Sequence, residues 1–196
     1  DAQESRGLGD VYKRQIYMKR FYKNEYVVWV EFDEESTAFF EEKCRLLDAH
    51  SIKPGVRPPH MTISFARTDS CFELMEYTKS FFSKNTVVID IDEVDMFTNR
   101  VVFYKPRQSE DLLSLQKDFC FGLLNFAKLS WNLYFPKNWT PHIALTDSLS
   151  KRQSIAAQNL MQKDFTPRSN VKIKKVIVKN CYTGEVFLSF DMDSLL

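Results

Sequence analysis

The chain has 196 residues, of which 44% are hydrophobic and 27% are charged, and this balance is typical of a packed globular protein rather than a disordered one. The formal net charge of +1 provides no general basic field for nucleic-acid binding, so an anionic ligand must be held by a local site. No apolar run approaches the roughly 20 residues that cross a bilayer, and we expect a cytoplasmic monomer with no membrane partner.

The four cysteines and the N-terminal residues add little to the functional prediction. The cysteines are far apart in the sequence and form no Cys-x-x-Cys pair, which argues against zinc-ribbon and thioredoxin-like proteins. We expect them to be reduced thiols of a cytosolic protein. Residues 1–15 lack an amphipathic period and are interpreted as a tail, or as a segment of artificial origin, outside a single folded domain that spans residues 16–196.

The first half of the chain predicts alternating strands and helices. A strand rich in β-branched and aromatic residues covers 26–32, and Asp33 is placed to cap a helix that ends before Pro54-Gly55. A second strand begins at His60, and the capping box of Ser70 and Glu73 predicts a helix over about 71–82. Two further strands, 86–92 and 100–104, are expected to form a hairpin.

The second half repeats this order. Ser109 is placed to cap a long helix with apolar residues at spacings of three and four, and an aromatic connector, 131–139, then leads into a strand at His142. A capping box at Ser150 and Gln153 predicts a helix near 155–161, and two strands over 171–178 and 185–190 follow. The order predicts an α+β fold with two duplicated β-α-β-type lobes, contributed by about 24–106 and 107–196, whose antiparallel or mixed sheets surround a central cleft.

The two predicted histidine strands share a pattern. Pro59-His60-Met61-Thr62-Ile63 and Pro141-His142-Ile143-Ala144-Leu145 both place a proline before a histidine, and then alternate apolar residues with small ones. Because side chains alternate between the two faces of a strand, each histidine shares its face with the small residue while the apolar residues face a core. Only three histidines occur in the chain, and two of them lie in this pattern.

Two histidines on equivalent strands suit acid–base chemistry on a phosphodiester. With an ordinary pKa of about 6.5, one neutral imidazole can act as general base while the other, protonated, acts as general acid. Thr62, on the face of His60, can donate a hydrogen bond to a phosphate oxygen. This chemistry needs no metal or other cofactor, and two histidines without a nearby carboxylate or cysteine cluster make a poor metal site.

These motifs resemble those of the two-histidine (2H) phosphoesterase superfamily, which includes the LigT-like 2′-5′ RNA ligases and RNA cyclic phosphodiesterases. His60-Met61-Thr62-Ile63 matches the first His-x-Thr/Ser motif, and the element order is similar over about 26–191. The resemblance implies a bilobal fold and an enzyme that acts without a cofactor on 2′,3′-cyclic or related phosphodiesters of nucleotides or RNA termini. It also implies that His60 and His142 form the acid–base pair and that Thr62 binds phosphate.

The second motif departs from the family, because Ala144 stands where threonine or serine is expected. Loss of one oxyanion donor typically lowers the rate by about 100- to 1000-fold. Thr146 lies about 6.6 Å further along the strand and cannot simply replace that hydroxyl. The alternative function is therefore a nucleotide- or RNA-end-binding protein with a degenerate site and little or no turnover.

The aromatic connector and the lysine-rich segment near the C-terminus each allow two interpretations. The aromatic residues of the 131–139 connector form either a base-stacking platform or part of the core, and the lysines of 172–179 form either a phosphate-steering stripe or a solvated sheet edge. His50 has no partner motif and is expected at the surface or as a helix cap. The acidic residues of 90–95 alternate within a strand and lack the glycine turn of a calcium-binding loop.

Overall fold

The computed structural model describes residues 21–55 and 57–195, so the predicted tail of residues 1–15 lies outside the described residues. The strands are β1 (Glu25–Phe32), β2 (His60–Arg67), β3 (Val88–Met96), β4 (Val102–Pro106), β5 (Lys128–Leu129), β6 (Ile143–Ala144), β7 (Arg168–Asn180) and β8 (Val186–Asp191). The helices are α2 (Glu34–Ala49), α3 (Cys71–Phe82), α4 (Glu110–Leu123) and α5 (Lys151–Asp164), with 3₁₀ turns η1 (Asn132–Tyr134) and η2 (Met192–Leu195).

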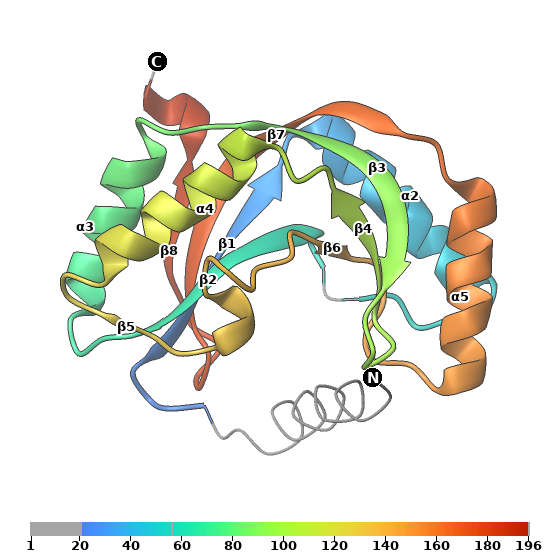
Figure 1. Cartoon of the computed structure of the whole chain (residues 1–196), viewed down its shortest axis with the longest axis horizontal. Coiled ribbons are helices and arrows are strands. Elements are labelled where there is room, and N and C mark those ends of the chain that lie inside the picture. The colour runs from blue at the N-terminus through green and yellow to red at the C-terminus, as the bar shows by residue number, and fades with distance from the viewer. Residues whose placement is uncertain (1–20, 56, 196) are drawn as a thin grey trace.

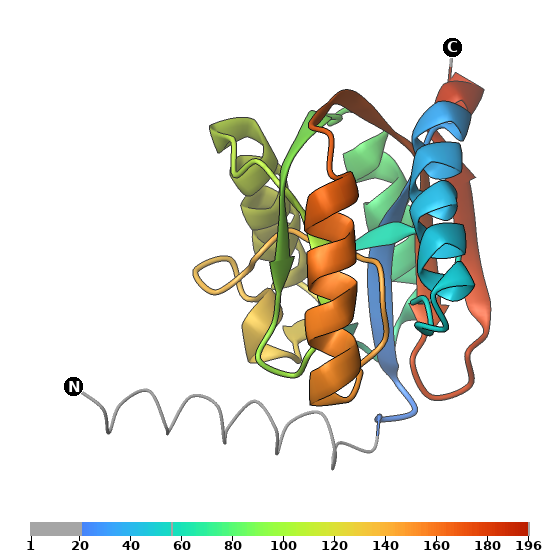
Figure 2. The same cartoon turned by 90° about the vertical axis from the view of Figure 1, so that its right-hand side faces the viewer.

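The strands form one antiparallel sheet in the order β1-β2-β6-β4-β3-β7-β8, with β5 added beside β2. Because β7 also pairs with β1, the pairing returns to its starting strand, and strands from both halves of the sequence interleave. Helices α3 and α4 contact each other on one side of the molecule, and α2 and α5 contact each other on the other side (Figure 1; Figure 2 shows the second pair). The α+β prediction is confirmed, and the division of the lobes near residue 106 remains a prediction.

Each helix begins at the residue that the sequence predicts as its cap. The side chain of Asp33 accepts a hydrogen bond from the Ser36 amide at 2.8 Å, and three serines make the equivalent contact for the other helices. These serine caps are Ser70 for α3, Ser109 for α4 and Ser150 for α5. A capped helix satisfies an amide that would otherwise lack a partner, which stabilises the helix by about 1 kcal/mol.

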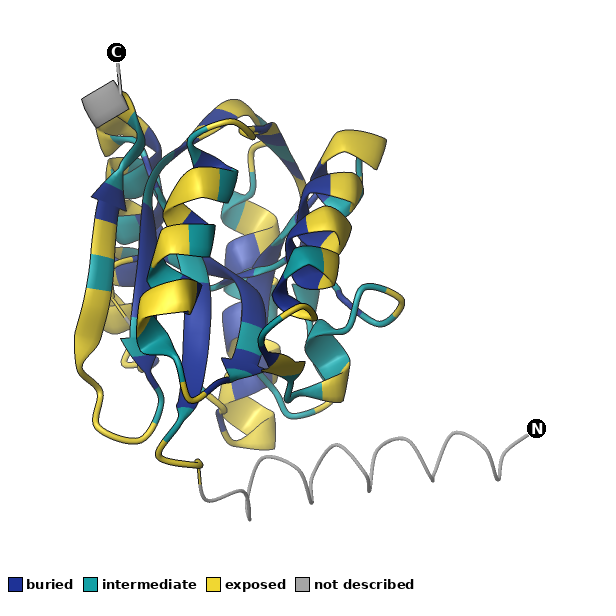
Figure 3. Cartoon of the chain, turned by 90° about the vertical axis from the view of Figure 1, so that its left-hand side faces the viewer, coloured by how far each residue is buried: buried dark blue, intermediate teal, exposed yellow. Residues whose placement is uncertain are grey.

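The apolar residues of the two histidine motifs lie in the core, as the strand alternation predicts. Met61, Ile63, Ile143 and Leu145 are all 0% exposed. Figure 3 shows the same division at the scale of the molecule, with buried strand surface beneath helices whose outer faces are exposed. Burial of the apolar face fixes the register of these strands, and with it the direction in which both histidines point.

The second histidine strand is shorter than the sequence suggests. It contains two residues, and His142 lies immediately before it. Pro141 has no N–H to donate to a ladder, which ends regular pairing on that side. Beyond Ala144 the amides of Leu145 and Thr146 both donate to the carbonyl of Val102, at 2.9 and 3.2 Å, so the strand is replaced by an irregular but bonded segment.

Candidate active site

The two histidines are held by the same local contact. Nδ1 of His60 lies 2.9 Å from the carbonyl oxygen of Pro58, and Nδ1 of His142 lies 2.8 Å from that of Thr140. Since a carbonyl oxygen only accepts, the hydrogen of each neutral ring is on Nδ1, and the Nε2 lone pair remains available to accept a proton. Both rings therefore have the tautomer that a general base at Nε2 requires.

The strand register brings the two motifs onto one face of the sheet. Met61 of β2 is the partner of Ile143 of β6 in an antiparallel pair. One step in opposite directions then places His60 opposite Ala144, and Thr62 opposite His142. Directly opposed residues have Cβ atoms about 4.5–5.5 Å apart and point to the same side, so four motif positions form a compact square.

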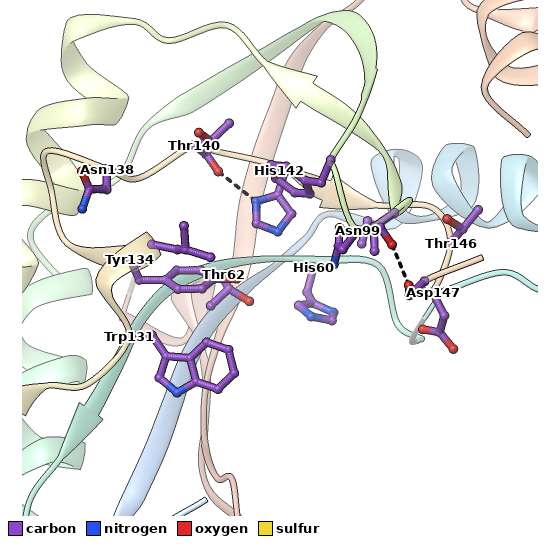
Figure 4. Close-up of a pocket in the computed structure, with 15 residues that line it drawn as sticks. His60, Thr62, Asn99, Trp131, Tyr134, Asn138, Thr140, His142, Thr146 and Asp147 are labelled. Carbon is purple, nitrogen blue, oxygen red and sulfur yellow. Dashed lines mark hydrogen bonds between the residues drawn. The ribbon is translucent and has the colours of Figure 1, made fainter. Parts of the chain in front are cut away.

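These residues line a pocket of about 380 Å³. Thr62 and both histidines are in its wall, together with Trp131 and Tyr134 (Figure 4). No lysine or arginine is among the described residues that line the pocket. Its one lining carboxylate, Asp147, forms an ion pair with Lys53 at 2.8 Å.

Burial lowers the pKa of both histidines below the ordinary value. For His60 this effect is opposed by the hydrogen bond to the Pro58 carbonyl and by the negative charge of Glu31, which lies directly across from it on β1. The pKa of His142 is lowered further by the charge of His60. Protonation of both rings at once is therefore unfavourable. Acid–base catalysis needs a pair that carries one proton in total, with one imidazole neutral and the other protonated.

Aromatic side chains hold each imidazole in place. The ring of Trp29 packs on His60 with centroids 4.8 Å apart, and the ring of Phe97 meets His142 edge-on at 4.9 Å. Trp29 itself donates a hydrogen bond from Nε1 to Glu31 at 3.1 Å. These contacts restrict ring rotation, which keeps the reactive nitrogens directed into the pocket.

The two ends of the motif square differ in hydrogen-bonding capacity. The hydroxyl-bearing Thr62 lies beside His142, whereas Ala144, beside His60, has no polar atom on its side chain. Thr146 also lines the pocket, and its Oγ1 accepts a hydrogen bond from the buried amide of Val102 at 3.0 Å, which fixes the side chain but leaves its O–H able to donate. One acceptor site of the Thr146 hydroxyl is thus used by the fold, and the residue lies two positions beyond Ala144, where it cannot simply replace a hydroxyl at position 144.

The remaining sequence candidates separate into pocket and structural residues. Trp131 and Tyr134 line the pocket, whereas Trp139 is buried in the core and donates to the carbonyl of Thr62 at 3.1 Å. His50 follows the end of α2 and has Nδ1 2.9 Å from the Leu46 carbonyl. None of the four lysines of β7 lines the pocket, and Lys174 forms ion pairs with two carboxylates of the C-terminal segment.

The acidic residues of β3 are paired with cations across the sheet. Arg107 contacts Asp90 and Asp92, and Lys105 contacts Glu93 and Asp95. Among the described residues, no group of three or more histidine, cysteine or carboxylate side chains is arranged to hold a metal ion. None of the helices in that part of the chain combines the length and apolarity needed to cross a membrane.

Comparison with known proteins identifies the fold. No protein-family model and no curated protein sequence matches the chain significantly. A crystal structure of a phosphoesterase aligns over 86% of this chain and 98% of its own, with 12% identity and a TM-score of 0.54. TT0787 of Thermus thermophilus aligns over 86% of this chain and 97% of its own, with 15% identity and a TM-score of 0.51. The chain has a 2H phosphoesterase-like fold. Escherichia coli LigT in complex with ATP also aligns, over 86% of this chain and 97% of its own, with 13% identity and a TM-score of 0.46.

The structure also places in the pocket residues that sequence patterns do not assign to the site. Asn99 reaches the pocket from the turn between β3 and β4, and Asn138 and Thr140 reach it from the connector before His142. Asparagine is common in turns for conformational reasons, so its presence in the sequence carries no sign of a binding role. Only the tertiary structure brings Asn99 to the histidines, whereas Thr140 lies two residues before His142 in the sequence.

Proposed function

We propose that this protein is a metal-independent phosphodiesterase that acts on 2′,3′-cyclic or related phosphodiesters of nucleotides or RNA termini. The observation that carries the proposal is the matched pair of histidines, His60 and His142, in one pocket with equivalent backbone contacts. Thr62, on the same face, is the phosphate-binding residue.

The reaction follows from one proton shared by two imidazoles. The neutral histidine accepts a proton from water through Nε2 as the water oxygen forms a bond to phosphorus. The protonated histidine gives its proton to the ribose oxygen as the bond between that oxygen and phosphorus breaks. A cyclic diester is thereby opened to a phosphate monoester, and the Thr62 hydroxyl donates to a non-bridging oxygen whose negative charge grows in the transition state.

The charge of the pocket favours a diester over a monoester. A phosphodiester carries one negative charge, whereas a terminal phosphate carries about −1.5 to −2 at neutral pH. The pocket has no lysine or arginine among its described lining residues, and a histidine pair with one proton supplies a single positive charge. The single negative charge of the diester therefore matches the single positive charge of the histidine pair. The monoester product carries more negative charge than the site neutralises, which assists its release.

Two aromatic residues beside Thr62 provide a surface for the nucleoside. The ring of Trp131 stacks on Phe65 with centroids 4.8 Å apart and lines the pocket, with Tyr134 next to it (Figure 4). Stacking of a base on an aromatic ring is worth about 1–3 kcal/mol and tolerates any base. This surface supports a nucleotide or RNA end as the ligand.

A second function, ligand binding with little or no turnover, is favoured by Ala144. If its missing hydroxyl has ended catalysis, the pocket will bind a nucleotide or RNA end without cleaving it, and Ala144→Thr will restore turnover. Absence of affinity for any phosphate ligand would reject this second function.

The deciding experiment is hydrolysis of the four nucleoside 2′,3′-cyclic monophosphates in EDTA by the wild type, His60→Ala, His142→Ala and His50→Ala. We expect turnover that survives the chelator and falls by about 100- to 10,000-fold in the first two variants. His50→Ala is the matched control, because this third histidine lies outside the pocket and should leave the rate unchanged. Full activity in His60→Ala or His142→Ala would contradict the mechanism.

Absence of turnover in every assay would direct the next measurement to oligonucleotides that end in a cyclic phosphate. Affinity without cleavage would favour the binding function, and no affinity would reject both functions. The monomeric state and the cytoplasmic location remain predictions from the sequence.

A further inference from the structure

The Ala144 end of the pocket is bordered by aromatic rings as well as by His60. Phe103 of β4 is the direct partner of Ala144, and the ring of Phe97 stacks on Phe103 with centroids 4.1 Å apart. Neither ring is a hydrogen-bond donor, so a phosphate oxygen at this end needs a donor from elsewhere. The turn between β3 and β4 lies over this end and brings Asn99 to it.

That turn is fixed by backbone hydrogen bonds. The amide of Arg100 donates to the carbonyl of Phe97 at 2.8 Å, and the amide of Phe97 donates to the carbonyl of Val101 at 3.0 Å. Arg100 adopts a φ of 68°, a left-handed conformation that closes the hairpin. Asn99 is also tied to the segment after β6, because Ser148 Oγ donates to its carbonyl at 2.6 Å. These hydrogen bonds hold the backbone of Asn99 in a fixed place at the edge of the pocket.

The side chain of Asn99 has a polar atom that the fold does not use. Its Oδ1 is buried and has no hydrogen-bond partner within the described part of the chain. Most buried polar atoms do have a partner, and without one at Oδ1 no hydrogen bond of that oxygen fixes the orientation of the amide group. The other pocket asparagine gives a contrast: Asn138 Nδ2 donates to the carbonyl and the side-chain oxygen of Asn132, at 3.0 and 2.9 Å.

We propose that the side-chain amide of Asn99 replaces the hydroxyl that Ala144 lacks, and donates a hydrogen bond to a non-bridging oxygen of the bound phosphodiester. This inference rests on the proposed function. The donor is the amide nitrogen Nδ2, which carries two N–H groups; Oδ1 is an acceptor and takes no part in the contact with the phosphate oxygen. Figure 4 shows Thr62 and Asn99 on opposite sides of the histidine rings, so the phosphate is bound from both ends.

An amide also keeps the charge of the pocket unchanged. A lysine or arginine at this position would bind a dianionic monoester better, whereas an uncharged donor retains the match to a singly charged diester. Asn99 thus contributes to the choice of substrate as well as to the rate. The hydroxyl missing at Ala144 is then replaced by the Asn99 amide, and the second motif need not be inactive.

The first test compares Asn99→Ala, Asn99→Asp and Thr98→Ala by steady-state kinetics on the preferred cyclic nucleotide. Loss of one donor to the transition state should lower kcat/KM of Asn99→Ala on the order of 100-fold. Asn99→Asp should lose at least as much, because a carboxylate would repel the phosphate. Thr98→Ala is the control, since this neighbouring side chain on the same turn is exposed and does not line the pocket. Unchanged kcat/KM in Asn99→Ala, or an equal loss in Thr98→Ala, would overturn the proposal.

The second test asks whether a donor at position 144 can replace the donor that we assign to Asn99. A hydroxyl introduced by Ala144→Ser should raise kcat/KM of Asn99→Ala by about 10-fold, and that of the wild type by less than about 3-fold. Ala144→Thr provides the same comparison with the family's larger residue. An equal gain in both backgrounds would show that Asn99 does not fill the role of the missing hydroxyl.

A binding measurement separates this inference from the proposed function. In a His142→Ala background, where turnover should be about 100- to 10,000-fold slower, calorimetric affinity for the cyclic nucleotide should fall by about 10-fold or more when Asn99→Ala is added. Equal affinity with and without Asn99→Ala would overturn the role of Asn99 alone. If the wild type shows no turnover and His142→Ala no affinity, the proposed function fails and the inference fails with it.

Discussion

The two histidine motifs have the same backbone contact but different surroundings. In both, Nδ1 lies within 2.9 Å of the carbonyl two residues earlier, and the next residue is a core residue with 0% exposure. Only the first motif contains a hydroxyl, that of Thr62, and only His60 has a carboxylate, Glu31, directly across the sheet. The groups that would transfer protons are therefore duplicated, whereas those that would bind phosphate are not.

The motifs also differ in how the fold holds them. His60 begins an eight-residue strand that pairs with β1 on one side and with β5 and β6 on the other. His142 precedes a two-residue strand, and its position depends on the contacts of Ile143 with Met61 and Tyr104. A long strand is thus not required to orient the ring. The proline and the local carbonyl contact are the features that both motifs share.

The largest effect that would distinguish the motifs is expected from Thr62→Val, which removes the hydroxyl but keeps the β-branched shape. We expect kcat/KM to fall on the order of 100-fold, because one donor to the phosphate is lost at the transition state. Thermal unfolding of the variant should stay close to that of the wild type, since the carbonyl of Thr62 still accepts from Trp139. A fall in kcat/KM of less than threefold would mean that the Thr62 hydroxyl does not bind the phosphate in the transition state, so that the two motifs contribute equally to phosphate binding.

The pH dependence of kcat/KM should sharpen the comparison between the histidines. The productive free enzyme carries one proton on the pair, and both pKa values are lowered from 6.5 by burial. Below the lower pKa both rings are protonated, and above the higher pKa neither is, so the bell-shaped profile should have its maximum below pH 6.5. A maximum above pH 7.5 would contradict this expectation.

Glu31→Gln identifies the limb of that profile that belongs to His60. The negative charge of Glu31 raises the pKa of His60, and its removal should move one limb to lower pH. Glutamine can still accept the hydrogen bond from Trp29, so the packing on His60 is retained. Movement of the acidic limb would assign His60 as the base, movement of the alkaline limb would assign it as the acid, and no movement would contradict the influence of Glu31.

Much of the fold and the placement of the two histidine motifs follow from sequence patterns. The capping residues Asp33, Ser70, Ser109 and Ser150 predict the starts of all four described helices, because a cap acts over three residues and needs no tertiary contact. The same locality applies to His60, Thr62 and His142. Their direction is determined by strand alternation and by buried neighbours in the same short segment.

Long-range placement is what the sequence patterns do not reveal. The two-residue β6 depends on pairing with β2 and β4, and Asn99 reaches the pocket only because its hairpin is bonded to Ser148, 49 positions further along the chain. The partner of the Thr146 hydroxyl is also long-range, an amide on β4. No local pattern encodes these contacts, because each depends on how segments far apart in the chain meet.

The smallest effect on activity is expected from Thr146→Val, the matched partner of Thr62→Val. Its hydroxyl accepts from the amide of Val102, a residue with 0% exposure, so the variant leaves a buried donor without a partner. The free energy of unfolding in urea should fall by about 1–3 kcal/mol, while kcat/KM stays within threefold of the wild type. Thr62→Val should show the opposite pattern, with lost activity and retained stability. If Thr146→Val instead lost activity without losing stability, its hydroxyl would act on the phosphate, and the Ala144 end of the pocket would have a second donor besides Asn99.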